Sequence, residues 1–371
     1  MDLDPSALLA IELLGDVNAS LNRAERAIER YEAYIGLDER SARVHYKLGL
    51  SRYRAGRLDA AASALQQALK LDPALGDAHY VLGLVLRDQN HLPAARRSLE
   101  EAGRRLPASQ TAPREALAEV YVLEGEHAKA INELEALAAL DTSRADRLVA
   151  VGLAQARAGR DDAAVITLGR AVDRFPDAPQ AYAALGHVWL TGAQRRGDRV
   201  ALNKALEALQ QAASRSDASS DTFAELGRAW SLAGDMQAAE RALRQAVARV
   251  PVPPEAYLQL ANVTVRDGRL QDARDALLKY AMLVGDDKPL AEVSTRIADL
   301  SMRLGEPTLA VRWFARAIDE AGPSAALQLR LAEAAWKSGD ITRAHQVVDD
   351  GLAAEPGNRL LAQLKRRLPA P

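Results

Sequence analysis

The chain has 371 residues, of which 48% are apolar but only 4% aromatic, and its formal net charge is −2. A nearly neutral chain lacks the basic surface with which proteins displace counterions from nucleic acid, so we expect no nucleic-acid partner. The absence of cysteine excludes disulfides and thiolate chemistry, and no apolar run reaches the length of a membrane span.

The N-terminal stretch is acidic and contains no basic segment followed by an apolar one. We therefore expect no signal peptide and a cytoplasmic location for the chain as it stands. The tripeptide Leu3-Asp4-Pro5 matches Leu71-Asp72-Pro73, which closes a later unit of the chain. This match predicts that the chain was cut from a longer array, and an upstream targeting signal would then make a periplasmic location the alternative.

Small residues recur along the chain with a period near 34. One track consists of alanine alone: Ala27, Ala61, Ala95, Ala130, Ala164, Ala205, Ala239, Ala273, Ala310 and Ala344. A second track of glycine or alanine runs 12 residues ahead of it, with one longer gap: Gly15, Gly49, Gly83, Ala118, Gly152, Gly186, Gly227, Ala261, Ala298 and Ala332. Small residues at one fixed phase indicate helices in close contact, and this period is typical of a helical solenoid.

The rest of each unit predicts a helix, a tight turn and a second helix. Most units carry a glycine between the two tracks: Gly56, Gly125, Gly159, Gly234, Gly268, Gly305 and Gly339. A large apolar residue follows each alanine by four positions: Tyr31, Leu65, Leu99, Leu134, Leu168, Leu209, Leu243, Leu277, Phe314 and Val348. Proline closes five units: Pro73, Pro107, Pro176, Pro251 and Pro356. We number the units as repeats one to ten, beginning near residues 8, 42, 76, 111, 145, 179, 220, 254, 291 and 325.

This pattern resembles the tetratricopeptide repeat family. Repeat two shows the motif in full: His45, Leu48-Gly49, Gly56, Ala61, Leu65, Ala68 and Pro73. The resemblance covers about residues 8 to 358 and implies an all-α, right-handed superhelical solenoid of about ten helix-turn-helix repeats. It implies little about the ligand, because the motif is structural and members of the family bind unrelated partners.

Two segments depart from the repeat. Repeat six carries about seven extra residues, and we expect Thr191 to Arg199 to form a polar, basic loop between its two helices. Beyond the array, Arg359 to Leu368 has helical apolar spacing with a basic face. Residues 359–371 are therefore predicted to form a capping helix and tail that keep the last repeat in solution.

The first helices of stacked repeats are expected to line a concave groove, with repeat positions 2, 5, 9 and 12 facing it. In repeats two, three and five these positions are aromatic or aliphatic: Tyr46, Leu50, Tyr53, Tyr80, Leu84, Val149 and Leu153. An apolar stripe rich in tyrosine favours a partner-binding surface. The alternative is that the curvature of the array buries these side chains against neighbouring helices.

In repeats seven to ten the same positions are polar and mixed in sign: Glu225, Arg228, Gln259, Asn262, Arg266, Thr295, Arg296, Asp299, Arg330 and Glu333. Arginine and asparagine on adjacent first helices can donate to the carbonyls or carboxylate of an extended peptide, and the alternative is a salt-bridged solvent face. Family members that clamp a C-terminal carboxylate need a lysine and an asparagine where repeat two has Tyr46 and Leu50. We therefore do not expect that clamp.

The sequence has no phosphate-binding glycine loop, no nucleophile elbow and no zinc motif. His45 and His79 lie at equivalent positions and could approach a metal together, but packing is the favoured role of that position. Glu333 could be paired with Glu225 or Asp299 as an acid and base, but a solvated face is favoured. We predict no metal, no cofactor and no enzymatic activity.

The sequence thus predicts a monomeric, non-enzymatic scaffold that binds an extended peptide or a partner protein in its groove. The residues expected to line that groove are Tyr46, Leu50, Tyr53, Tyr80, Leu84, Leu153, Arg228, Asn262, Arg266, Arg296 and Arg330. One alternative is a periplasmic or envelope assembly factor of an exopolysaccharide or protein export system. Another is the substrate-recognition arm of a larger enzyme.

Overall fold

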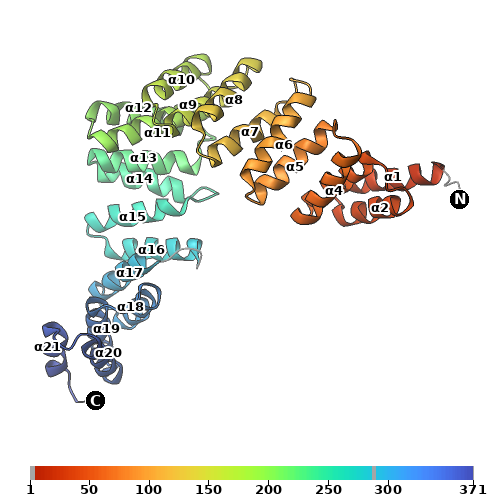
Figure 1. The fold of residues 1–371 in the computed structure, drawn as a ribbon. Helices are drawn as coiled ribbons and strands as arrows, with labels where there is room; N and C mark the ends of the chain where they lie inside the picture. The colour runs from red at the N-terminus through yellow and green to blue at the C-terminus, as the bar shows by residue number, and fades with distance from the viewer. Residues whose placement is uncertain (1–4, 286–289, 371) are drawn as a thin grey trace. The chain divides into compact units, whose positions relative to one another are not determined.

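Helices account for most of the described backbone. The computed structural model describes residues 5–285 and 290–370, and within these residues the only regular elements are helices α1 to α21 (Figure 1). The all-α fold predicted from the sequence is confirmed. Leu3 and Asp4, on which part of the N-terminal tripeptide match depends, lie outside the described residues.

Two sets of helices alternate along the chain. The first helices of the repeats are α1 (Pro5–Ser20), α3 (Ala42–Arg54), α5 (Gly76–Asp88), α7 (Ala112–Leu123), α9 (Ala145–Arg157), α11 (Pro179–Arg196), α13 (Ser220–Ala233), α15 (Pro254–Arg266), α17 (Ala291–Arg303) and α19 (Ala325–Lys337). The second helices are α2 (Ala24–Leu37), α4 (Leu58–Leu71), α6 (Leu92–Arg105), α8 (His127–Leu140), α10 (Asp161–Arg174), α12 (Arg199–Ala213), α14 (Met236–Val247), α16 (Leu270–Val284), α18 (Pro307–Ala321) and α20 (Ile341–Ala354), and α21 (Arg359–Arg367) follows them.

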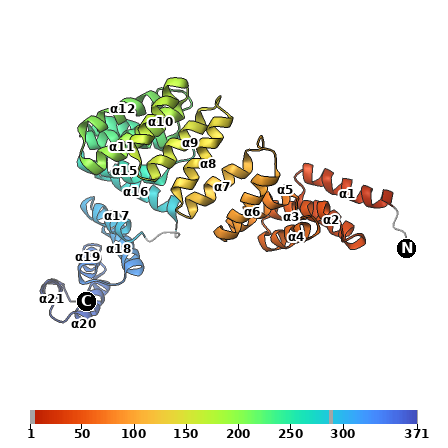
Figure 2. The same cartoon turned by 45° about the horizontal axis from the view of Figure 1, so that its top comes forward.

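The chain divides into two compact bodies, Met1–Ala184 and Leu185–Pro371, which we describe separately. Within each body a first helix packs against the second helix of its own repeat, and that second helix packs against the first helix of the next repeat. Figure 2 shows the same succession from another direction. Because most contacts join helices that are adjacent along the chain, with weaker contacts between first helices of successive repeats, the fold is built from local contacts.

The two tracks of small residues hold the helices of a repeat together. All ten alanines of the first track are fully buried. At Gly49 an added Cβ would lie 2.6 Å from Cγ of Leu65 and 3.3 Å from the carbonyl oxygen of Ala61, closer than carbon atoms normally approach. Glycine is therefore required for α3 to lie this close to α4. Equivalent contacts join Gly83 to Leu99, Gly152 to Leu168 and Gly227 to Leu243.

The turn between the two helices of a repeat uses a residue with positive φ. Gly56 has a φ of +74°, a conformation that costs glycine little. Repeat three lacks a glycine there and uses Asn90 at +60°, because asparagine tolerates the left-handed region better than most residues. Five of the second helices end shortly before the prolines that were predicted to close them.

The extra residues of repeat six are mostly helical, so the loop predicted for Thr191 to Arg199 is wrong. Helix α11 continues to Arg196, because Leu190 and Ala193 are buried in the core of repeats six and seven and extend its packed face. The turn is confined to Gly197, which has a φ of +67°, and Asp198, which accepts hydrogen bonds from the backbone of the next helix. Packing outweighed the polar composition of this segment.

The C-terminal helix α21 packs on the last repeat. Leu361 and Leu364 are buried in a cluster with Leu331 of α19 and Val348 of α20. The outer side of α21 is basic at its end, where three charged residues follow one another in Lys365-Arg366-Arg367.

Ion pairs also link successive repeats. In the second body Arg269, just before α16, donates hydrogen bonds to Glu240 of α14, and Arg244 donates to the same carboxylate at 2.7 Å. These hydrogen bonds, first the one from Arg269, lower the pKa of Glu240 to about 2 even though its partial burial opposes the shift. The carboxylate of Glu240 is thus strongly stabilised in its charged form.

Candidate functional site

The aromatic residues predicted for the groove lie side by side on two first helices of the first body. Tyr46, Leu50 and Tyr53 are on α3, and Tyr80 and Leu84 are on α5; all five are half-buried and pack at the margin of core clusters. We call these five residues the α3/α5 patch. Its side chains are neither fully buried nor fully exposed. Both predictions from the sequence, a partner-binding surface and burial against neighbouring helices, therefore apply in part.

The tyrosines of the α3/α5 patch are held in place by burial and by one hydrogen bond. Burial raises the pKa of Tyr46 and of Tyr80, because the phenolate would lose hydration, and nearby carboxylates add to the effect. The hydroxyl of Tyr53 donates to Oδ2 of Asp88 at 2.8 Å. The rings therefore present a fixed apolar surface, and they lose little conformational entropy when a partner binds.

The α3/α5 patch does not continue to Leu153. On the intervening first helix, α7, the corresponding positions carry Glu115 and Glu119, whose carboxylates accept hydrogen bonds from Arg147 and Arg87, each at 2.6 Å. Leu153 is half-buried on α9. The seven apolar positions predicted from the sequence thus form one patch of five residues and a separate pair, Val149 and Leu153, on α9.

In the second body four of the predicted polar residues, Arg228, Gln259, Asn262 and Arg266, line one hollow. Arg228 on α13 and Asn262 and Arg266 on α15 surround a cavity of about 430 Å³, together with Gln194, Ser231, Leu232 and Gln259. We call this the α13/α15 pocket. Its position follows from the repeat, because equivalent positions of consecutive first helices face the same side.

Two residues of the α13/α15 pocket have buried polar atoms without a partner. Within the described part of the chain, Nε of Arg228 donates no hydrogen bond and Oε1 of Gln259 accepts none. Oε2 of the adjacent Glu225 also accepts none. The other oxygen of Glu225 lies 2.7 Å from Nδ1 of His187 and accepts from Arg228 at 3.3 Å. A buried polar atom left unpaired costs about 1–3 kcal/mol, so these atoms mark where water or a polar ligand completes the network.

The pocket also offers donors that are not engaged within the described part of the chain. Arg266 is exposed and makes no hydrogen bond or ion pair there. Asn262 accepts through Oδ1 from Arg296 of α17, which leaves its amide group free to donate. Leu232, 46% exposed, supplies an apolar wall. The pocket therefore presents donors, an acceptor and an apolar surface within one hollow.

The remaining polar positions behave as a surface network. Arg330 donates to Asp299 at 2.9 Å, and both side chains are nearly half exposed. Burial raises the pKa of Asp299, although Arg330 opposes the shift. Arg296 reaches the pocket only through Asn262, and Arg330 lies outside it. Glu225 is engaged with His187 and Arg228.

The two equivalent histidines bind backbone rather than each other. Nε2 of His45 lies 2.9 Å from the carbonyl oxygen of Glu39, and Nε2 of His79 lies 3.1 Å from that of Pro73. Each ring thus fixes the loop before its own helix. The described residues contain no group of three or more metal-ligating side chains.

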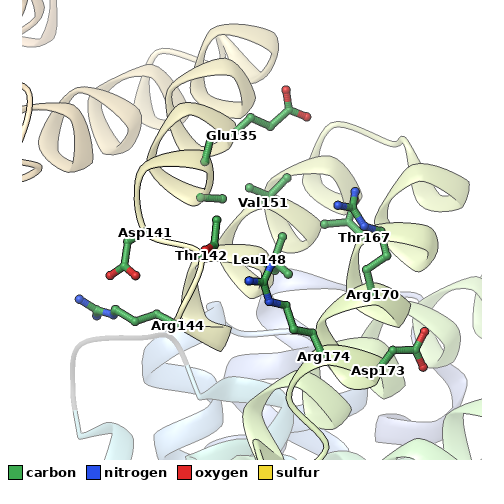
Figure 3. A pocket seen from close by; sticks show the side chains of 12 residues that line it. Glu135, Asp141, Thr142, Arg144, Leu148, Val151, Thr167, Arg170, Asp173 and Arg174 are labelled. Carbon is green, nitrogen blue, oxygen red and sulfur yellow. The ribbon is translucent and has the colours of Figure 1, made fainter.

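A larger hollow of about 620 Å³, which the sequence analysis did not predict, lies between α8, α9 and α10 of the first body (Figure 3). Arg170 and Arg174 of α10 line it together with the apolar side chains of Leu148 and Val151. Three arginines are balanced by three carboxylates in its lining: Arg144, Arg170, Arg174, Glu135, Asp141 and Asp173. The spacing of Arg170 and Arg174 is the only signal that would have revealed it. Among the described residues, none of the side chains that line this hollow has a buried polar atom without a partner, so the α13/α15 pocket is the stronger candidate site.

None of the described helices combines the length and apolar character of a membrane-spanning segment. Models described as tetratricopeptide repeat match residues 12–76, 46–113 and 225–289, residues 301–368 and residues 148–178. A search of curated proteins gave no match.

Several solved structures have a similar fold. The MamA protein is 24% identical, with a TM-score of 0.43 over 46% of this chain and 92% of that one. The crystal structure of the APC/C hetero-tetramer Cut9-Hcn1 contains a chain that is 12% identical, with a TM-score of 0.38 over 99% of this chain and 97% of that one. PilF of Pseudomonas aeruginosa is 18% identical, with a TM-score of 0.42 over 60% of this chain and 97% of that one.

Proposed function

Since the chain belongs to the tetratricopeptide repeat family, we propose that it is a non-enzymatic scaffold that binds an extended segment of a partner protein across its first helices. The repeat fold supports a role in protein–protein interaction. The α13/α15 pocket supports the mode of binding, because it lies where the first helices of neighbouring repeats face the same side.

One observation carries this proposal: the buried, unpaired Nε of Arg228 and Oε1 of Gln259 in the α13/α15 pocket. A peptide backbone alternates carbonyl acceptors and N–H donors, so it satisfies a donor and an acceptor placed in one hollow. Pairing such atoms removes the free-energy penalty that they carry in the unbound chain.

The other residues of the pocket define the class of segment that fits. Arg266 and the amide of Asn262 add donors suited to a backbone carbonyl or to an acidic side chain, for which a guanidinium gives charge-assisted bonds. Leu232 provides apolar contact. We propose a segment with an acidic residue next to an aliphatic one at this pocket.

The α3/α5 patch is proposed as a second contact surface. Its fixed, half-buried tyrosines offer the kind of apolar anchor that supplies most of the affinity in protein interfaces. The two surfaces lie in different bodies, and the proposal treats each as binding on its own.

The test uses peptides selected from a random display library against the whole chain, followed by calorimetric titration. Arg266→Ala is the sharpest variant, because this side chain makes no contact that the fold needs. Losing charge-assisted hydrogen bonds of about 1.5–3 kcal/mol is expected to weaken binding by about tenfold or more. Gln259→Ala is expected to weaken it as well.

The matched control is Arg241→Ala, on the exposed surface of the second helix α14. We expect this variant to bind as the parent does, and we expect the melting temperature to stay unchanged for Arg266→Ala and Arg241→Ala. Peptides that bind equally well to both pocket variants but lose affinity for the Arg241 variant would place the site on the second helices and refute the proposal.

A further inference from the structure

The hollow between α8, α9 and α10 of the first body contains two arginines that the fold leaves unpaired. Arg170 and Arg174 lie one helical turn apart on α10, and both line the hollow (Figure 3). We call them the α10 arginine pair. Within the described part of the chain neither forms a hydrogen bond or an ion pair, and the guanidinium of Arg174 lies 5.7 Å from the centre of the Phe175 ring. Two guanidinium groups are therefore available to a ligand.

The repeat register shows that this pair does not serve the helix. Arg170 and Arg174 stand six and ten positions after Ala164 of the alanine track. At these two positions other repeats place side chains that bind each other: Glu101 with Arg105, Gln245 with Arg249, and Arg316 with Glu320. Repeat five alone has two cations there. Because like charges one turn apart destabilise a helix, the stability of α10 does not explain the pair.

The other charged groups of the lining do not neutralise the α10 arginine pair. Arg144 donates to both carboxylate oxygens of Asp146, at 3.1 and 2.6 Å. Asp141 accepts from the hydroxyl of Ser143 at 2.6 Å and from its backbone N–H at 3.1 Å, and these bonds lower the pKa of Asp141. The positive charge of the α10 arginine pair thus has no counter-charge bound to it in the described structure.

The hollow also has an apolar side. Leu148 and Val151 of α9 line it, together with Ala138 and Ala139 of α8. Leu148 is half-buried, and Val151 is buried. The volume of about 620 Å³ lies within the range of about 300–1,000 Å³ that is typical of small-molecule sites. A molecule in the hollow therefore meets aliphatic surface and two guanidinium groups at once.

We propose that this hollow binds a carboxylate carried on an aliphatic chain. The α10 arginine pair donates hydrogen bonds to the carboxylate, for which the planar guanidinium is a geometric match, and the chain packs on Leu148 and Val151. The bound anion also offsets the repulsion between the two arginines. Three carboxylates in the lining repel a doubly charged phosphate more strongly than a singly charged carboxylate. The site lies in a different body from the α13/α15 pocket, and its assignment does not depend on that pocket.

Two sources can supply this chemistry: a free aliphatic acid, or an acidic side chain next to an aliphatic one in a partner chain. Calorimetric titration of the whole chain with octanoate and with the blocked peptide acetyl-leucyl-glutamyl-leucyl-amide distinguishes them. The probe that binds more tightly identifies the source. Octanol, which lacks the charge, and acetate, which lacks the chain, are each expected to bind about tenfold more weakly than octanoate or worse.

Arg174→Glu is the decisive variant. It gives repeat five the complementary pair that repeat nine has in Arg316 and Glu320, so its melting temperature without ligand should equal or exceed that of the parent. Its affinity for the better probe should nevertheless fall about tenfold or more, because a cation is replaced by an anion. A structural role for Arg174 would instead lower the melting temperature.

Two variants serve as controls, and both are expected to bind as the parent does. Arg97→Glu makes the same charge change on the exposed surface of α6, and Arg266→Ala removes the exposed arginine of the α13/α15 pocket. Neither octanoate nor the peptide binding to the parent would overturn the proposal. So would equal affinity of the parent and Arg174→Glu, or a loss of affinity in Arg266→Ala alone, which would place the carboxylate in the α13/α15 pocket.

Discussion

Replacing Ala164 with leucine tests the packing of the repeat most directly. Ala164 is fully buried on α10, one turn before Leu168, which lies against Gly152 of α9. Leucine adds three carbon atoms at a site where the backbones of α9 and α10 are already in close contact. Because protein interiors are packed as densely as organic crystals, these atoms have no space to enter without moving a helix.

The cost follows from that geometry. Adding methylene groups to a filled core destabilises a protein by about 1–3 kcal/mol, and leucine itself differs little from alanine in helix propensity. The body that contains Ala164 has 184 residues. For a unit of that size each kcal/mol corresponds to about 2–4 °C, so we expect the melting temperature to fall by about 2–12 °C.

Thermal unfolding followed by circular dichroism checks this value against two controls. Ala33→Leu adds the same atoms at an exposed position in the middle of α2 and should stay within about 0.5 kcal/mol of the parent. Gly169→Ala lies on the open side of α10, where nothing is within 4 Å of an added Cβ, and should stabilise the chain by about 0.5–1 kcal/mol. Equal losses for Ala164→Leu and Ala33→Leu would refute the assigned repeat phase.

Three further predictions concern the end of the array, pH and the α3/α5 patch. Truncation after Asn358 removes α21 and exposes the apolar side of repeat ten, so the shortened chain should associate more than the full chain does at micromolar concentration, as measured by light scattering. A shortened chain with the mass and the stability of the full chain would contradict a capping role. The pKa of Glu240 is lowered on folding, so its ion pairs stabilise the folded chain above its unfolded pKa of 4.5, and this stabilisation is lost as the pH falls toward 2. The Glu240→Gln variant should therefore melt below the parent at pH 7, and the two melting temperatures should converge in acid. A difference in melting temperature that does not change with pH would contradict the ion pair. For a peptide that binds the first body, Tyr46→Ala with Tyr80→Ala should weaken binding by about 1 kcal/mol or more per residue in calorimetry, and unchanged affinity at preserved fold would exclude the patch.

The sequence by itself determined the helix pairs and their spacing. The tracks through Gly49 and Ala61 and their equivalents encode the contact between the two helices of a repeat, and the first helices of repeats two to ten begin within one residue of their predicted starts. This succeeds because each repeat contacts only its neighbours, so a pattern within about 34 residues contains the information that the fold requires.

Tertiary structure decided the conformation and the partners of side chains that can contact more than one helix. The polar stretch Thr191 to Arg199 became mostly helix because Leu190 and Ala193 had a core to enter. Of the polar residues predicted for the groove, Arg228, Gln259, Asn262 and Arg266 share a hollow, whereas Arg330 is engaged with Asp299 outside it. Repeat position says which side of a helix a residue occupies. Which atoms are left without a partner depends on how side chains from different helices meet, and only the folded chain brings them together.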